Sequence, residues 1–145
     1  MTRHFRRARW RAALVCVLGV AGVASVATTG AEAKAPGQRH CYGGVCHRVM
    51  TLAETAAAVG KVSRIAVSHY DDCRRDRFNP CGLTSSGEVF RPQEANNTAS
   101  SIHPDGTILL LRHPITRQAA VVRVNNFGPF KSHRQLDVSL ATAER

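Results

Sequence analysis

The chain has 145 residues, and 20 Lys and Arg stand against 10 Asp and Glu, which gives a formal net charge of +10. A chain of this length has room for one small domain but not two, so we expect a single domain. The basic balance favours anionic partners such as anionic polymers.

The first 33 residues have the pattern of a secretory signal peptide. Arginines precede an apolar run over residues 12–26, and Ala31-Glu-Ala33 follows as a small-x-small cleavage site. The apolar run has about fifteen residues, fewer than the ~20 that span a membrane. We therefore expect cleavage after Ala33 and an exported, periplasmic protein of the bacterial cell envelope, soluble and without a stable membrane anchor. Nucleic acid is not an expected partner in that compartment.

Residues 34–60 are the predicted N-terminal segment of the exported protein, and the rest of the chain is its main domain. Disulfides are the default for Cys41, Cys46, Cys73 and Cys81 in an oxidising compartment. We prefer the local pairs Cys41–Cys46 and Cys73–Cys81, although four cysteines allow three connectivities. The cysteine and histidine spacing around residues 40–47 matches neither a haem nor a zinc motif, so no metal and no cofactor are expected.

Helix signals surround residues 52–59. Thr51 is a suitable N-cap, Glu54 completes a capping box three residues later, and Gly60 suits the helix end. Residues 61–70 alternate imperfectly between apolar and polar side chains and predict a first strand, followed by a charged surface loop over residues 71–80.

The later part of the chain is richer in strand signals. Residues 107–112 and 119–125 predict two strands, joined by residues 113–118 as a hairpin loop. Residues 136–139 predict another short strand, and residues 140–145 begin a helix. The sequence therefore predicts a mainly β domain with short helices.

Three short motifs stand in this part of the chain: Thr84-Ser-Ser-Gly-Glu88, Val124-Asn-Asn-Phe-Gly-Pro-Phe130 and Leu136-Asp-Val-Ser139. Their order and spacing resemble the RlpA family (rare lipoprotein A), septal-ring lytic transglycosylases with the patterns T-A-S-G-E, V-N-D-R-G-P-F and I-D-L-S. The resemblance implies a six-stranded double-psi β-barrel over residues 61–145. It also implies that the substrate is the glycan strand of peptidoglycan and that the activity is endolytic transglycosylation, a lyase reaction that leaves 1,6-anhydro-MurNAc ends.

Proteins of this family continue past the third motif through a helix and a final strand. The chain stops at Arg145. The resemblance therefore implies a barrel that lacks its last strand here, with an exposed sheet edge. A fragment of a longer protein is an open interpretation.

Two carboxylates in motif positions are the candidate catalytic residues. The resemblance carries the family's functional glutamate onto Glu88, whose alternative role is that of a solvated or capping residue in a turn. Asp137 matches the aspartate that faces the glycan groove in related double-psi barrels, and its alternative role is the N-cap of the following helix.

The chain departs from the family pattern at two of the three functional positions. Asn126 replaces the family aspartate, with Phe127 at the neighbouring arginine, and an amide cannot transfer a proton as a carboxyl does. Ser100 or Ser101 stands at the family histidine, and His103 is the nearest substitute. The predicted substrate-binding set is Tyr70, Asn126, Ser100, Ser101 and His103.

These departures keep a second function open. The same groove would hold glycan strands without cutting them, as an expansin-like, non-catalytic peptidoglycan-binding barrel does. Tyr70 matches a family tyrosine, but buried packing is the commoner role of an aromatic at a strand end. The sequence contains no signal for protein partners.

Overall fold

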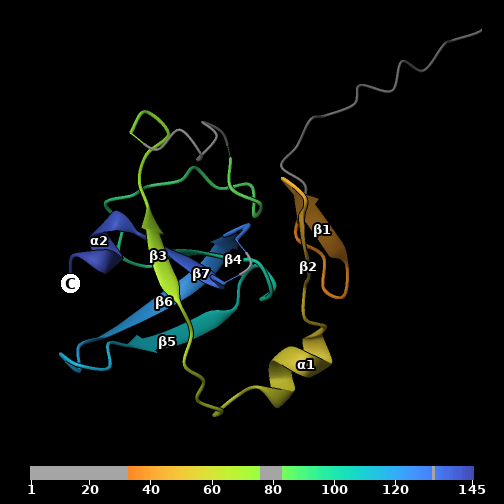
Figure 1. The fold of residues 1–145 in the computed structure, drawn as a ribbon, viewed down its shortest axis with the longest axis horizontal. Coiled ribbons are helices and arrows are strands. Elements are labelled where there is room, and N and C mark those ends of the chain that lie inside the picture. The colour runs from red at the N-terminus through yellow and green to blue at the C-terminus, as the bar shows by residue number, and fades with distance from the viewer. Residues whose placement is uncertain (1–32, 76–82, 132) are drawn as a thin grey trace, which may run out of the picture.

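The computed structural model describes residues 33–75, 83–131 and 133–145 (Figure 1). The expected signal peptide over residues 1–33 falls, apart from its last residue, outside the described residues, as does Cys81. The strands are β1 (Arg39–Tyr42), β2 (Val45–Arg48), β3 (Val67–Tyr70), β4 (Asn97–Ser100), β5 (Ile108–Arg112), β6 (Ala119–Asn126) and β7 (Leu136–Ser139). The helices are α1 (Leu52–Ala57) and α2 (Leu140–Ala143).

The main domain is built on a five-stranded mixed sheet with strand order β3-β7-β4-β6-β5. The pairs β3–β7 and β4–β6 are parallel, and the pairs β4–β7 and β5–β6 are antiparallel. Within the described residues β3 and β5 each have one neighbour, so the sheet stays open and no closed barrel forms. The predicted mainly β architecture is confirmed, and closure into a barrel is not.

The apolar core is small, and most of its strand residues lie on one face of this sheet. Val122 and Val124 of β6 and Leu136 and Val138 of β7 are buried, as alternation along a strand requires. Much of the remaining buried surface is polar, including Thr98 beside these valines. A domain with so little apolar burial depends on hydrogen bonds and covalent links for its stability.

Two parts of the sheet differ from the sequence-based expectation. The first strand covers only residues 67–70 instead of 61–70, because the stretch before it finds no partner and Val62 is 99% exposed. The strand β4 was not predicted. Its residues are small or polar and are all buried between β6 and β7, so the apolar alternation that marks a half-exposed strand is absent.

The N-terminal segment forms a separate two-stranded sheet, β1–β2, beside the main domain (Figure 1). Gly43 and Gly44 connect the strands with φ of +56° and +80°, the primed turn that favours glycine. Cys41 lies opposite Cys46 in the register and forms the predicted disulfide with it. Cys73 is also disulfide-bonded, and its predicted pairing with Cys81 stays a prediction.

The capping box of α1 is confirmed. The hydroxyl of Thr51 accepts from the backbone N–H of Glu54 at 3.1 Å, and the Glu54 carboxylate accepts from the Thr51 N–H at 2.7 Å. Replacing Thr51 with Ala should lower the free energy of unfolding by about 1 kcal/mol, because the Glu54 N–H loses its acceptor and the Glu54 carboxylate loses the hydroxyl donor. Urea denaturation measures this loss, and Ser63→Ala in an exposed stretch is the control. An equal effect of both substitutions would contradict the capping role.

Candidate functional site

The first motif forms a tight turn that presents Glu88. The Thr84 N–H donates to the Glu88 carbonyl at 2.8 Å, and the Gly87 N–H donates to the Thr84 carbonyl at 2.9 Å. Gly87 has φ of +82°, a backbone conformation that residues other than glycine rarely adopt. The glycine therefore closes the turn and fixes the direction in which the next side chain leaves it.

Glu88 is held by an arginine and an amide from β6. Its carboxylate accepts from the Arg123 guanidinium at 2.5 Å and from the Asn125 amide at 3.1 Å. The Arg123 hydrogen bond and then that from Asn125 lower the pKa of Glu88 to about 2. The side chain is 41% exposed and carries a negative charge at neutral pH. Glu88 is thus ionised at neutral pH and is not a ready proton donor.

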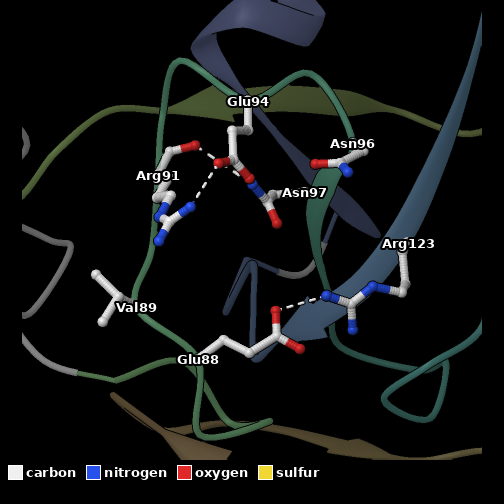
Figure 2. Close-up of a pocket in the computed structure, with 7 residues that line it drawn as sticks. All are labelled: Glu88, Val89, Arg91, Glu94, Asn96, Asn97 and Arg123. Atoms are coloured by element: carbon white, nitrogen blue, oxygen red, sulfur yellow. Dashed lines mark hydrogen bonds and ion pairs between the residues drawn. The ribbon is translucent and has the colours of Figure 1, made fainter.

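A polar pocket of about 310 Å³ opens beside this ion pair. Figure 2 shows Glu88 and Arg123 pointing toward one another, and Arg91 and Glu94 forming a second pair at 2.9 Å. The pocket is lined by Glu88, Val89, Arg91, Glu94, Asn96, Asn97 and Arg123. Carboxylates, guanidinium groups and amides together offer donors and acceptors suited to a ligand rich in hydroxyl and amide groups.

The second motif meets the first at its two asparagines. The Asn126 side-chain oxygen accepts from the Ser85 N–H at 3.2 Å and from the Phe127 N–H at 2.9 Å. The Asn125 carbonyl accepts from the Ser86 N–H at 3.2 Å, and its amide group also donates to Asn97 at 2.8 Å. The Asn126 side chain therefore holds the turn before Glu88 through the Ser85 N–H. An amide oxygen is sufficient for this role.

Asp137 lies on β7 between two buried apolar neighbours and points to the opposite face. The register places it beside Ser68 of β3 and Ala99 of β4. The Ser68 hydroxyl donates to the Asp137 carboxylate. The side chain that caps α2 is Ser139, so the alternative role of Asp137 as N-cap is wrong.

The strand register places Asp137 and the partners of Glu88 on one face of the sheet. Arg123 pairs with Asn97, and Asn97 shares its face with Ala99 two residues later. Ala99 in turn pairs with Asp137. Side chains at paired positions stand on the same face, so Asp137 and Arg123, the partner of Glu88, lie on the face opposite Val124 and Val138.

Tyr70 is 7% exposed and stacks on Phe90 with ring centroids 4.2 Å apart. Burial, with a smaller contribution from the negative charge of Asp137, raises the pKa of its hydroxyl above the ordinary value. The phenol therefore stays neutral. This geometry favours the packing role of Tyr70, while its contact with substrate stays a prediction.

The three residues around the family histidine position close a turn. The buried Ser100 hydroxyl accepts from the backbone N–H groups of Ile102 at 3.3 Å and His103 at 3.0 Å. Ser101 is buried as well. Burial, followed by the positive charge of Lys34, lowers the pKa of His103. At neutral pH His103 is therefore an uncharged ring in a half-buried turn.

Lys34 is the residue that the sequence analysis did not single out. Its fully buried ammonium donates to the carbonyls of Ser100 at 2.8 Å and Asn126 at 3.0 Å and pairs with Asp105 at 3.2 Å. The hydroxyl of Ser85 donates to the same carboxylate at 2.9 Å. Burial outweighs the attraction of Asp105 and lowers the pKa of Lys34 to about 8. Lys34 thus links Ser100 of β4 to Asn126 of β6 and, through Asp105, to Ser85 of the first motif.

Across residues 33–75, 83–131 and 133–145, no three His, Cys, Asp or Glu side chains gather closely enough to hold a metal ion. Across the same ranges, no helix has the length and apolar character needed to cross a membrane.

The fold and this face define a β-rich domain with a polar, carboxylate-bearing pocket. No protein-family model matches the chain. Over 60 residues it is 37% identical to a protein described as the probable endolytic peptidoglycan transglycosylase RlpA of Treponema pallidum (strain Nichols). The match spans 41% of this chain and 19% of that protein's length. This similarity supports an RlpA-like relationship.

The low pKa of Glu88 has a measurable consequence. A carboxylate whose folded pKa is depressed contributes stability above its unfolded pKa, and this contribution is lost as the pH falls through the folded value. The free energy of unfolding should therefore fall between pH 4.5 and about 2 more steeply in the wild type than in Glu88→Gln. Urea titrations across this range measure the difference. Arg123→Gln should flatten the profile similarly, and an unchanged slope in both variants would contradict the ion pair.

Proposed function

We propose that this protein acts on the glycan strands of peptidoglycan as an exported RlpA-like protein. The observation that carries the proposal is the junction of two motifs at Glu88, Asn125 and Asn126, on the sheet face that also bears Asp137. The similarity to a protein described as a peptidoglycan transglycosylase supports the same substrate class.

The proposed architecture is an open form of the RlpA-like double-psi β-barrel over residues 61–145, after a leader over residues 1–33 and a segment over residues 34–60. The two parallel strand pairs, β3–β7 and β4–β6, support it, because each requires a crossover through the rest of the domain. The polar face between these pairs is the proposed glycan groove.

The first proposed activity is endolytic transglycosylation with Asp137 as the single acid and base. Its carboxyl would protonate the glycosidic oxygen after MurNAc, and its carboxylate would then accept the proton of the sugar's own 6-hydroxyl. That oxygen closes the 1,6-anhydro ring, so the proton returns to Asp137 and no water is consumed. The Ser68 hydroxyl orients the carboxylate for both steps.

Glu88 takes a different part in this proposal. Its pKa of about 2 suits a permanent negative charge that stabilises the positive charge developing on the sugar ring. Asn126 holds the Glu88 turn and thereby orients substrate without exchanging protons. One carboxyl for proton transfer and one for charge stabilisation is a division seen in other glycosidases.

The second proposed function is binding without cleavage. The amide of Asn126 at the family aspartate position favours it, because an amide cannot transfer a proton as a carboxyl does. The buried Ser100 and Ser101 point in the same direction. In this form the pocket beside Glu88 would hold glycan strands and leave them intact.

One experiment tests the substrate class and separates the two functions. Purified sacculi are incubated with the exported, oxidised protein; the supernatant is assayed for 1,6-anhydro-MurNAc ends and the pellet for bound protein. Anhydro ends support transglycosylation, and bound protein without product supports the binding function. Neither product nor binding, with circular dichroism showing folded protein, would refute the proposed function.

A further inference from the structure

The chain enters the folded domain at the expected leader cleavage site, between Ala33 and Lys34. Lys34 is 3% exposed, whereas Ala33 directly before it is exposed. The bond expected to be cut therefore lies where the chain passes from solvent into the domain. The backbone nitrogen of Lys34 donates to Asp105 Oδ2 at 3.4 Å, while its side-chain ammonium contacts Asp105 Oδ1 at 3.2 Å.

We propose that removal of the leader after Ala33 makes Lys34 the N-terminal residue and that its new α-ammonium binds Asp105 as a built-in N-terminal anchor. A leader peptidase adds water across the Ala33–Lys34 amide. The carbonyl carbon gains the hydroxyl oxygen and becomes the carboxylate of Ala33, and the nitrogen leaves as an amine. At neutral pH that amine takes up a proton, because its ordinary pKa is about 8.

The geometry offers each ammonium its own oxygen. The side-chain ammonium of Lys34 faces Oδ1, and the α-nitrogen faces Oδ2. The Ser85 hydroxyl donates to both oxygens, at 3.0 and 2.9 Å, and keeps the carboxylate in this orientation. An amide N–H at the same position is a neutral donor, and a charged donor strengthens such a hydrogen bond.

The other charged or titratable groups near this cluster do not replace the anchor. Burial, and then the positive charge of Lys34, lower the pKa of His103, which keeps its ring neutral. The negative charge of Asp105 makes a small contribution to raising the pKa of Arg123, but the Arg123 guanidinium binds Glu88. Processing therefore adds one positive charge beside Asp105, at the point where the first two motif segments meet. This inference holds whether the groove cuts glycan or only binds it.

The test begins with the exported protein made from the full chain, whose N-terminus is read by mass spectrometry. The inference predicts a start at Lys34, and a start at any other residue would overturn it. A matched variant with two residues inserted after Ala31-Glu-Ala33, so that processing leaves a dipeptide before Lys34, moves the α-amine away from Asp105.

Acylation of the α-amine at neutral pH is then compared between the two proteins. Asp105 should raise the α-amine pKa by about one unit, which slows labelling about tenfold relative to the extended variant. The slowing should disappear in Asp105→Asn and in urea. Equal labelling of the two folded proteins would refute the anchor, and this comparison does not require Asp105→Asn to fold.

Discussion

Asp137→Asn should reduce the release of 1,6-anhydro-MurNAc ends by about a hundredfold or more, because the amide can neither donate nor accept the transferred proton. The carboxylate stands on the sheet face opposite the apolar core and accepts a hydrogen bond from Ser68. An amide fits the same space, and its oxygen still accepts from the serine. The loss should therefore appear in the rate of cleavage and not in the binding of sacculi.

Two variants make this prediction specific. Glu144→Gln makes the same chemical change on an exposed carboxylate at the end of α2 and should leave the rate unchanged. Ser68→Ala removes the orienting hydroxyl and should give an intermediate loss. Cleavage by Asp137→Asn at the wild-type rate would exclude Asp137 as the acid and base, and equal losses in all three variants would indicate a folding defect.

Lys34→Met should lower the free energy of unfolding by about 3 kcal/mol, the range expected when one partner of a buried ion pair is removed. The thioether fills similar space, so the cost arises from lost interactions. Asp105 would lose its contact with the buried ammonium and keep the Ser85 hydroxyl and the backbone nitrogen of residue 34. The carbonyls of Ser100 and Asn126 would lose a charged donor. For a small domain this loss is a large part of the total stability.

Urea denaturation of the exported protein measures this effect. Lys61→Met, at an exposed position, is the control and should change the midpoint little. Adding Asp105→Asn to Lys34→Met should recover part of the loss, because the carboxylate that has lost its side-chain ammonium is removed. A loss below about 1 kcal/mol in Lys34→Met would show that the buried contacts of Lys34 contribute no more than a surface pair does.

Local patterns in the sequence were sufficient for several elements. The capping box at Thr51 and Glu54 predicts α1, because both partners lie within one turn of the chain. The strands β5, β6 and β7 follow from apolar runs in the same way. The Cys41–Cys46 disulfide was predicted, yet the hairpin around it was not, although Gly43 and Gly44 between two short runs are a hairpin signal.

Other features depend on contacts between distant residues. The strand β4 has no apolar pattern, since its polar side chains bond to partners from neighbouring strands, as Thr98 does to the Asp137 carbonyl. The bond between Glu88 and Arg123 joins residues 35 positions apart. The Lys34 contact with Asn126 spans 92 positions. The motifs identify the carboxylates of the candidate site. They do not identify Arg123, which lowers the pKa of Glu88, or Lys34, which binds Asp105 and the carbonyls of Ser100 and Asn126.

The most direct test of the proposed groove is an NMR titration of the ¹⁵N-labelled protein with a glycan-strand fragment free of stem peptides. The account predicts that the largest amide shifts fall on Glu88, Asn97 and Arg123, and that Glu88→Gln weakens the binding. Shifts confined to the β1–β2 hairpin, or an absence of shifts at saturating fragment, would contradict glycan binding at this face.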